Sequence, residues 1–329
     1  MPATGTSAVH PLCAIEGGRV DVEGTSFPVE QEFLPEVRVG GQRARVVFAS
    51  ATRLGVVVPP GLDGGRIPVH VAPFDSAAAG FVDIAAPFAT GLHQVDNPVF
   101  DRDGNLYVTY SGTRGQQVPV SIFRVRPNGT RETFSSGIVN PTSMAIDPSG
   151  QLFVSSRFEG TVYRVMEDGS TEAFAHDLGV ACGLAFAPDG VLFVGDRSGT
   201  IFRVDPSGHA TTFATLPASV AAFHLAIGPD GALYVTGPTL SSYDPLYRIE
   251  PDGAIATPYA RFGRPQGLAF DRSGSLFVVE ALAGSSGLYR VSDGADPELV
   301  LAGPALVGVA FDSGGAIVVA SNETAYRLR

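Results

Sequence analysis

A short phrase of one aromatic residue, one arginine and one aliphatic residue recurs six times along this 329-residue chain. The aromatic residue stands at positions 123, 163, 202, 247, 289 and 326, so successive copies lie 37 to 45 residues apart. A repeat of about 40 to 50 residues is the length of one β-propeller blade. The repeat therefore favours a radial array of similar units for this part of the chain.

Each copy also contains a tight turn upstream of the phrase. The turn ends in glycine and leads into an apolar segment, as in Asp147–Gly150 before Leu152–Val154. Glycine supplies the positive φ that a hairpin turn needs, and aspartate or asparagine tolerates it. A further turn follows most of the arginines, as at Asp168–Gly169. Each unit thus predicts four antiparallel strands, and six units predict a six-bladed propeller.

The ring of blades must also close. The last unit ends after its third strand, and a segment that matches a fourth strand, Ala86–Thr90, precedes the first unit. We expect residues 81–90 to cross over and complete the last blade. Such a closure removes a sheet edge that would otherwise be exposed to aggregation.

The N-terminal segment follows a different pattern. Between residues 11 and 72, short alternations of apolar and polar residues end at glycine or proline turns, and Pro59–Pro60 closes one of them. A series of this kind predicts a β-sandwich. The expected fold class is all-β, with a sandwich domain at residues 1–75, a linker at 76–80 and the propeller at 81–329.

Charge and cysteine usage narrow the range of partners. The formal net charge is −11, and all 22 basic residues are arginines. An acidic chain repels nucleic-acid phosphates and anionic lipids, so we expect neither as a partner. We find no leader segment and no apolar run of the roughly 18 to 20 residues that a membrane span needs. Cys13 and Cys182 are expected to be unpaired, which predicts a cytoplasmic protein that meets a membrane only through its partners.

The blade phrases at residues 81–329 resemble those of the NHL repeats and of the SMP-30/gluconolactonase-like propellers. The N-terminal phrases are similar to the IPT/TIG family, which implies an immunoglobulin-like fold and a role in pairing with proteins or spacing domains. The gluconolactonase resemblance implies lactonase activity and a divalent cation at the channel mouth. The pairing of the two domains is also similar to membrane-extrinsic subunits of bacterial photosynthetic reaction-centre and antenna complexes, although no motif here binds pigment.

The positions that correspond to the cation ligands of that family depart from its pattern. Asp96-Asn97-Pro98 stands where the family has Glu-Ser-Pro, and Thr142, Cys182, Phe223, Gln266 and Val307 occupy the later positions. One carboxylate in such a set makes a poor cage for a hard cation, so Ca²⁺ is disfavoured and no cofactor or catalytic residue is expected. Asp96 is the single candidate metal ligand. The candidate residues for binding at the channel mouth are Asp96, Asn97, Asn140, Thr142, Cys182, His224 and Gln266.

Two connections between second and third strands are longer than the others, at Tyr110–Val120 and Gly237–Pro245. Loops on a rigid scaffold often carry binding residues, and these two should project from the same end of the ring. The repeated arginine, in contrast, is expected to serve packing by pairing with the aspartate of the turn. The interaction candidates in the two loops are Tyr110, Arg114, Gln116, Gln117 and Tyr243.

Two functional hypotheses follow from these patterns. The first is a non-catalytic protein-interaction or scaffold subunit of a larger assembly. The second is a metal-dependent lactonase or related hydrolase that acts on a small ligand at the channel mouth, and it predicts that calcium raises thermal stability. An RNA-binding propeller of the NHL type is a third alternative, and it requires a basic face.

Overall fold

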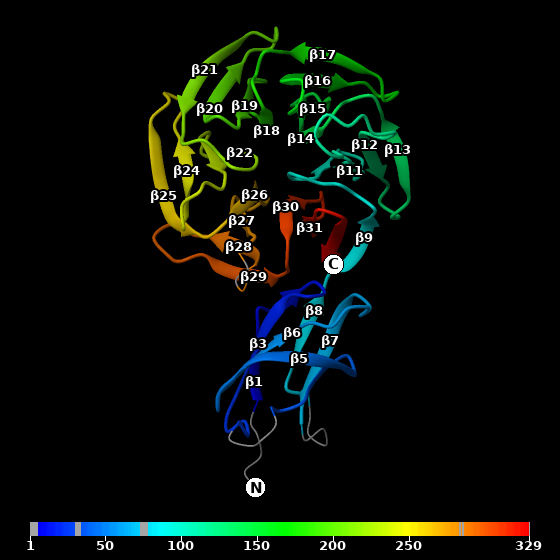
Figure 1. Cartoon of the computed structure of the whole chain (residues 1–329), viewed down its shortest axis with the longest axis vertical. Coiled ribbons are helices and arrows are strands. Elements are labelled where there is room, and N and C mark those ends of the chain that lie inside the picture. Colours follow the sequence, from blue (N-terminus) through cyan, green and yellow to red (C-terminus); the bar gives the residue numbers. More distant parts are fainter. Residues whose placement is uncertain (1–5, 30–33, 73–77, 283, 285, 329) are drawn as a thin grey trace.

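The computed structural model describes residues 6–29, 34–72, 78–282, 284 and 286–328. Within these ranges the chain forms strands and no helix, which confirms the all-β class. It follows that no helix able to cross a membrane occurs in this part of the chain. Figure 1 shows a ring of sheets, with the N-terminal strands attached to one side of it.

Five separate four-stranded antiparallel sheets stand around the ring in a propeller-like arrangement of five blades (Figure 1). The first sheet comprises β10 (Val99–Phe100), β11 (Leu106–Thr109), β12 (Ile122–Val125) and β13 (Arg131–Ser135). The second comprises β14 (Pro141–Ile146), β15 (Leu152–Ser156), β16 (Thr161–Val165) and β17 (Thr171–Ala175). The third comprises β18 (Ala181–Phe186), β19 (Leu192–Asp196), β20 (Thr200–Val204) and β21 (Ala210–Thr215). The fourth comprises β22 (His224–Ile227), β23 (Leu233–Thr236), β24 (Asp244–Ile249) and β25 (Ile255–Phe262).

The fifth sheet joins the two ends of the ring. It contains β30 (Leu306–Phe311), β31 (Ile317–Ser321), β32 (Thr324–Leu328) and, from the start of the propeller, β9 (Ala86–Thr90). Residues 86–90 pair antiparallel with β32, as the sequence predicts. The prediction was wrong for the rest of the expected closing segment, residues 81–85. Residues 80–84 form β8 and pair with β7 instead, because Val82 and Ile84 are buried in the N-terminal core.

Four further strands continue the same antiparallel order. They are β26 (Pro265–Phe270), β27 (Leu276–Glu280), β28 (Gly287–Val291) and β29 (Glu298–Ala302). β29 pairs in parallel with the short β2 (Cys13–Ala14), and β2 pairs in parallel with β8 (Gly80–Ile84). The ladder therefore runs without a break from the ring into the N-terminal strands as one twelve-stranded sheet.

The N-terminal strands surround a core of their own, rich in valine. They are β1 (Thr6–His10), β3 (Arg19–Gly24), β4 (Val37–Val39), β5 (Gln42–Ala49), β6 (Arg53–Val57) and β7 (Gly65–Val71). Alternation along β3 and β4 buries every second residue, as the apolar–polar pattern predicts. Of the expected linker at 76–80, residues 76–77 lie outside the described residues, as does the expected boundary at residue 75, and Gly80 already belongs to β8.

The repeated arginine packs on the outer part of the sheets, as expected. Arg248 pairs with the turn residue Asp230 at 2.8 Å, and Arg327 pairs with the turn residue Asp312. Three other copies pair with a glutamate on the fourth strand rather than with a turn aspartate: Arg124 with Glu132, Arg164 with Glu172 and Arg290 with Glu298. A residue that makes surface ion pairs in five of its six copies serves the scaffold and marks no single site.

Candidate functional site

One end of the ring carries the elements that could form a site. In each sheet the inner strand begins opposite the end of the second strand, as Pro141 lies opposite Ser156 and Pro265 opposite Glu280. The connections from second to third strands therefore gather at this end, which we call the loop end. Both long connections, residues 110–121 and 237–243, leave from it.

An axial cavity of about 370 Å³ lies between the inner strands. Asp96 and Asn97 line it together with the inner strands, and apolar side chains such as Phe100 and Phe186 line it further along those strands. The segment before β10 thus brings two polar side chains to the ring axis. Their partners decide whether they remain available to a ligand.

Asp96 is 2% exposed and pairs with a residue of a distant sheet. A hydrogen bond of 2.6 Å joins its Oδ1 to Nδ1 of His224, which is fully buried at the start of β22. The same oxygen accepts the backbone N–H of Asn97 at 2.7 Å. The pair therefore links the crossing segment to β22 inside the ring, and Nε2 of His224 is buried without a hydrogen-bond partner.

The amides at the channel mouth are also occupied by the chain itself. Asn97 donates through Nδ2 to the carbonyl of Leu268 at 2.8 Å and accepts through Oδ1 from the backbone of Val309 at 2.9 Å. The Asn97 side chain thus joins β26 to β30 by hydrogen bonds. Asn140, at φ 50°, donates to the carbonyls of Ser111 and Thr113 and accepts from Gly115 at 2.6 Å. Its side chain therefore fixes the long connection at residues 110–121, which we call the blade-one loop.

Three of the remaining candidates lie nearby and are similarly buried. The Thr142 hydroxyl donates to the carbonyl of Asn140 at 3.0 Å. The Cys182 thiol donates to the carbonyl of Val180 at 3.2 Å, and burial raises its pKa to about 12. Both cysteines are free thiols, as expected. Gln266 is 7% exposed at the start of β26, and its side chain makes no hydrogen bond with the described residues.

This set of donors does not fit the divalent cation that gluconolactonase-like propellers imply. The Asp96 oxygen is already shared by two donors, the Asn140 amide is saturated, and a thiol with a pKa near 12 is not a thiolate at neutral pH. Hard cations take several free oxygen ligands. Among the described residues, no three His, Cys, Asp or Glu side chains are arranged to hold a metal ion.

The residues predicted in the two long loops divide into structural and exposed ones. Tyr110 packs between His93, whose ring is tilted at a centroid distance of 6.0 Å, and Phe123, whose ring meets it edge-on at 6.3 Å. Gln116 folds back and accepts from both the backbone and the hydroxyl of Thr113. Gln116 is nevertheless exposed, as are Arg114, Gln117 and Tyr243.

A groove of about 460 Å³ at the loop end lies beside the blade-four loop. Arg197 lines it, together with Leu240, which is 93% exposed, and Tyr243, which is 59% exposed. The Ser219 hydroxyl closes one wall by donating to the carbonyl of Pro238 at 3.0 Å. The groove combines exposed apolar surface with the Arg197 cation, which donates to the Ser219 carbonyl at 3.4 Å and makes no ion pair with the described residues.

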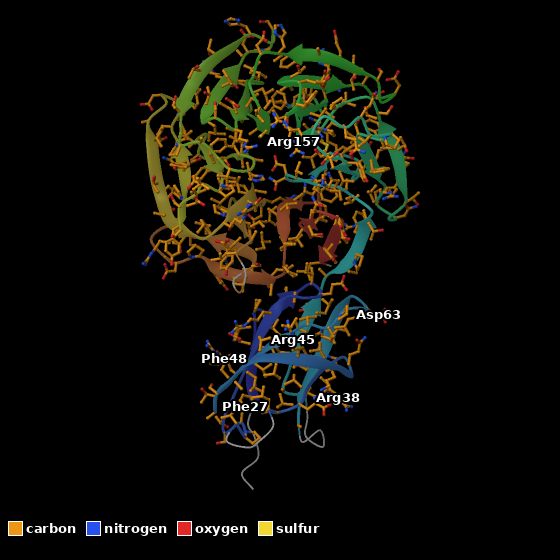
Figure 2. The ribbon with its side chains drawn as sticks, in the orientation of Figure 1. Phe27, Arg38, Arg45, Phe48, Asp63 and Arg157 are labelled. Atoms are coloured by element: carbon orange, nitrogen blue, oxygen red, sulfur yellow. The ribbon has the colours of Figure 1, made fainter. Side chains whose placement is uncertain are left out.

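Our sequence reasoning missed two arginines at the loop end. Arg157 directly follows β15 and Arg197 directly follows β19, so both take the same place in neighbouring sheets. Figure 2 shows Arg157 at the inner side of the ring. The available signal was the position itself, since an arginine follows the second strand in two consecutive repeats. We read the repeated arginine of the third strand and passed over this one.

No family model and no curated protein matches the sequence. Solved structures match at the level of the fold. A candidate gluconolactonase aligns with a TM-score of 0.60 and 17% identity, over 74% of this chain and 91% of its own. An auxiliary nutrient binding protein from Bacteroides thetaiotaomicron aligns with a TM-score of 0.58 and 13% identity, over 98% and 97%. A catalytically inactive virginiamycin B lyase from Staphylococcus aureus, with quinupristin, aligns at 0.53 and 15%, over 99% and 95%.

These likenesses define a class of fold. The chain is a β-propeller protein whose neighbours include gluconolactonase-like and virginiamycin B lyase propellers. One fold of this kind supports both binding proteins and enzymes, so the function must be argued from the loop end.

Proposed function

We propose that this chain is a non-catalytic binding subunit that docks a protein partner on its loop end. The observation that carries the proposal is the set of large apolar side chains exposed there. Phe158 is 53% exposed, Leu240 93%, Tyr243 59% and Leu282 44%, and each lies in a connection from a second to a third strand. Large apolar side chains exposed at one end of a scaffold favour an interaction site, and aromatic residues and arginine are enriched in interfaces.

The chemistry of the channel mouth supports binding rather than catalysis. A lactonase of the resembled type needs a cation site and a free carboxylate as general base. Asp96 is buried and hydrogen-bonded to His224, and the Asn140 side chain is hydrogen-bonded to backbone groups. A metal-dependent hydrolase is therefore the less favoured function, and it predicts stabilisation by calcium and turnover of lactones.

We also propose a finer description of the architecture. β26–β29 repeat the strand order of the five separate sheets, which supports a sixth blade. β1, β3, β6 and β5 on one side, and β4, β7 and β8 on the other, enclose one core, which supports an immunoglobulin-like sandwich of the IPT/TIG type. A binding domain appended to a propeller supports a place in a larger assembly, and a membrane-extrinsic subunit of a photosynthetic complex is one such role.

The test uses the tagged full-length chain expressed in its own cells and recovered by gentle solubilisation. Its native mass is compared with that of a double variant, Leu240→Ser with Tyr243→Ser. We expect the parent chain to migrate with a larger complex and the double variant to lose at least about tenfold of the bound partner, as interface hot spots do. The matched control is Met166→Ser with Ile255→Ser, two exposed apolar residues at the opposite end of the ring.

Two results would contradict the proposal. The first is a free monomer in both soluble and membrane fractions. The second is a calcium-dependent rise in melting temperature together with turnover of simple lactones by the purified chain, which would establish the hydrolase instead.

A further inference from the structure

Three guanidinium groups lie near one another at the channel mouth. Arg157 and Arg197 occupy equivalent places after β15 and β19, and Arg114 comes from the blade-one loop. Arg197 and Arg114 both act electrostatically on Arg157, which is half-buried, and the backbone N–H groups of Arg157 and of Gly115, next to Arg114, both bond to Asn140. Figure 2 shows Arg157 inside the ring, where the loops of several sheets converge.

This cluster has no carboxylate partner among the residues that the structure describes. In the described ranges, none of the three arginines makes an ion pair. Burial lowers the pKa of Arg157; Cys182 opposes this shift, while Arg197 and Arg114 lower the pKa further. Cys182 adds no charge at neutral pH, because burial raises its own pKa to about 12.

Two carboxylates of the loop end, those of Asp196 and Glu280, are engaged by groups of the turns around them. Asp196 accepts from the backbone of Val180 at 2.8 Å and from the Ser198 hydroxyl. Glu280 accepts three backbone N–H groups, from the residues that follow β25 and β27. Like charges held together without a counter-ion destabilise the fold, so an external anion would relieve a cost that the chain carries alone.

Unsatisfied polar atoms beside the cluster provide an independent observation. The Ser111 Oγ is fully buried without a hydrogen-bond partner, and so is the Nδ1 atom of the neighbouring His93. Asn140 connects these residues to the cluster: its side-chain amide donates to the Ser111 carbonyl at 2.6 Å, and its own carbonyl accepts from the backbone N–H of Arg157 at 3.3 Å. Buried polar groups are normally bonded, so these two atoms lack the partner that such atoms usually have.

We propose that Arg157, flanked by Arg114 and Arg197, binds a carboxylate group of the docked partner, from an acidic side chain or a chain end. The planar guanidinium matches a carboxylate through two parallel hydrogen bonds. Charge complementarity selects an acidic segment, and the exposed Leu240 and Tyr243 beside Arg197 select one with apolar neighbours. This inference rests on the proposed function for the source of the carboxylate, but the site itself can be tested without the partner.

The first experiment titrates the full chain with succinate, followed by calorimetry, with sodium chloride at matched ionic strength as the salt control. We expect saturable binding to one site. Arg157→Gln should weaken it by about tenfold or more, which is the worth of charge-assisted hydrogen bonds. Arg272→Gln is the matched control, because Arg272 is exposed, forms no ion pair and lies at the opposite end of the ring.

The second experiment measures retention of the native partner by the parent chain and by Arg157→Gln, with and without succinate. We expect the variant, or excess succinate, to release the partner. Succinate binding that equals the salt control, or that survives Arg157→Gln, overturns the carboxylate site. If the partner is lost with Leu240→Ser and Tyr243→Ser but kept with Arg157→Gln, the site fails while the proposed function stands. If succinate binds through Arg157 and no partner requires this end, the assignment of the carboxylate to a partner is wrong.

Discussion

At the residue scale, hydrogen-bond partners separate the side chains that build the loop end from those that can bind there. Glu280 and Asp196 are buried carboxylates of the kind that often bind ligands. Here their oxygens accept hydrogen bonds from backbone N–H groups of the surrounding turns. Such groups would otherwise be buried without partners, at a cost of about 1–3 kcal/mol each. The Arg157 side chain makes no ion pair with the described residues, which is why it is the better candidate for recognition.

Replacing Asp96 by alanine should destabilise the protein strongly. The change leaves His224 buried at 0% exposure without its partner and removes the acceptor for the Asn97 N–H. Breaking a buried pair from one side costs about 3–5 kcal/mol in the free energy of unfolding. Urea denaturation would measure the loss, and Asp103→Ala, in an exposed turn, should change the value by no more than about 0.5 kcal/mol. A loss below about 1 kcal/mol for Asp96→Ala would show that the pair is not structural.

The sequence predicted residues of this site, but not their pairing. Asp96 and His224 were both identified as channel-mouth candidates, yet 128 residues separate them. A repeat fixes which strand a residue begins, and it does not fix how far a crossing segment reaches over the axis. The same limit hid the role of Asn97, whose amide binds two inner strands far along the chain.

At the element scale, the ring closes because β9, from the start of the propeller, completes the last sheet. β9 pairs with β32 and buries Ala89 at 6% exposure, while the neighbouring Thr90 points outward. The matching fourth-strand phrase made this closure predictable, because every blade needs a partner for its third strand. β8 was misplaced because its alternation suits any sheet, and only burial of Val82 in the N-terminal core decides its neighbour.

A charge on the inner face of β9 should open the ring. Ala89→Asp places an unpaired carboxylate among the buried side chains around Ala325 and Leu106, which costs several kcal/mol, on the order of 3 or more. The freed edge of β32 then favours pairing between molecules. We expect a lower melting temperature and concentration-dependent association in analytical ultracentrifugation. Thr90→Asp, one residue along on the exposed face, is the control, and equal behaviour of the two variants would refute the closure argument.

At the scale of the whole molecule, the N-terminal strands are joined to the ring by both a ladder and a core. β2 pairs with β29, and the backbone of Ile15 donates to the carbonyl of Ala302 at 2.9 Å. The Ile15 side chain, 1% exposed, packs with Leu301 and Leu306 in a core of the ring. The two parts should therefore unfold together, because separating them exposes apolar surface and breaks a continuous sheet.

Weakening that junction should uncouple the two parts. Ile15→Ala removes buried methyl groups at the contact, and large-to-small changes of this kind cost about 2–5 kcal/mol. We expect one calorimetric transition for the parent chain, and for Ile15→Ala an earlier, separate transition of the N-terminal strands. Leu12→Ala is the matched control three residues away, since Leu12 is 60% exposed. If Ile15→Ala retains a single transition at the parent temperature, the Ile15 side chain does not couple the N-terminal strands to the ring. The coupling would then lie in the backbone, in the pairs Cys13 with Leu301 and Ala14 with Ala302 and in the bond from Ile15 to Ala302.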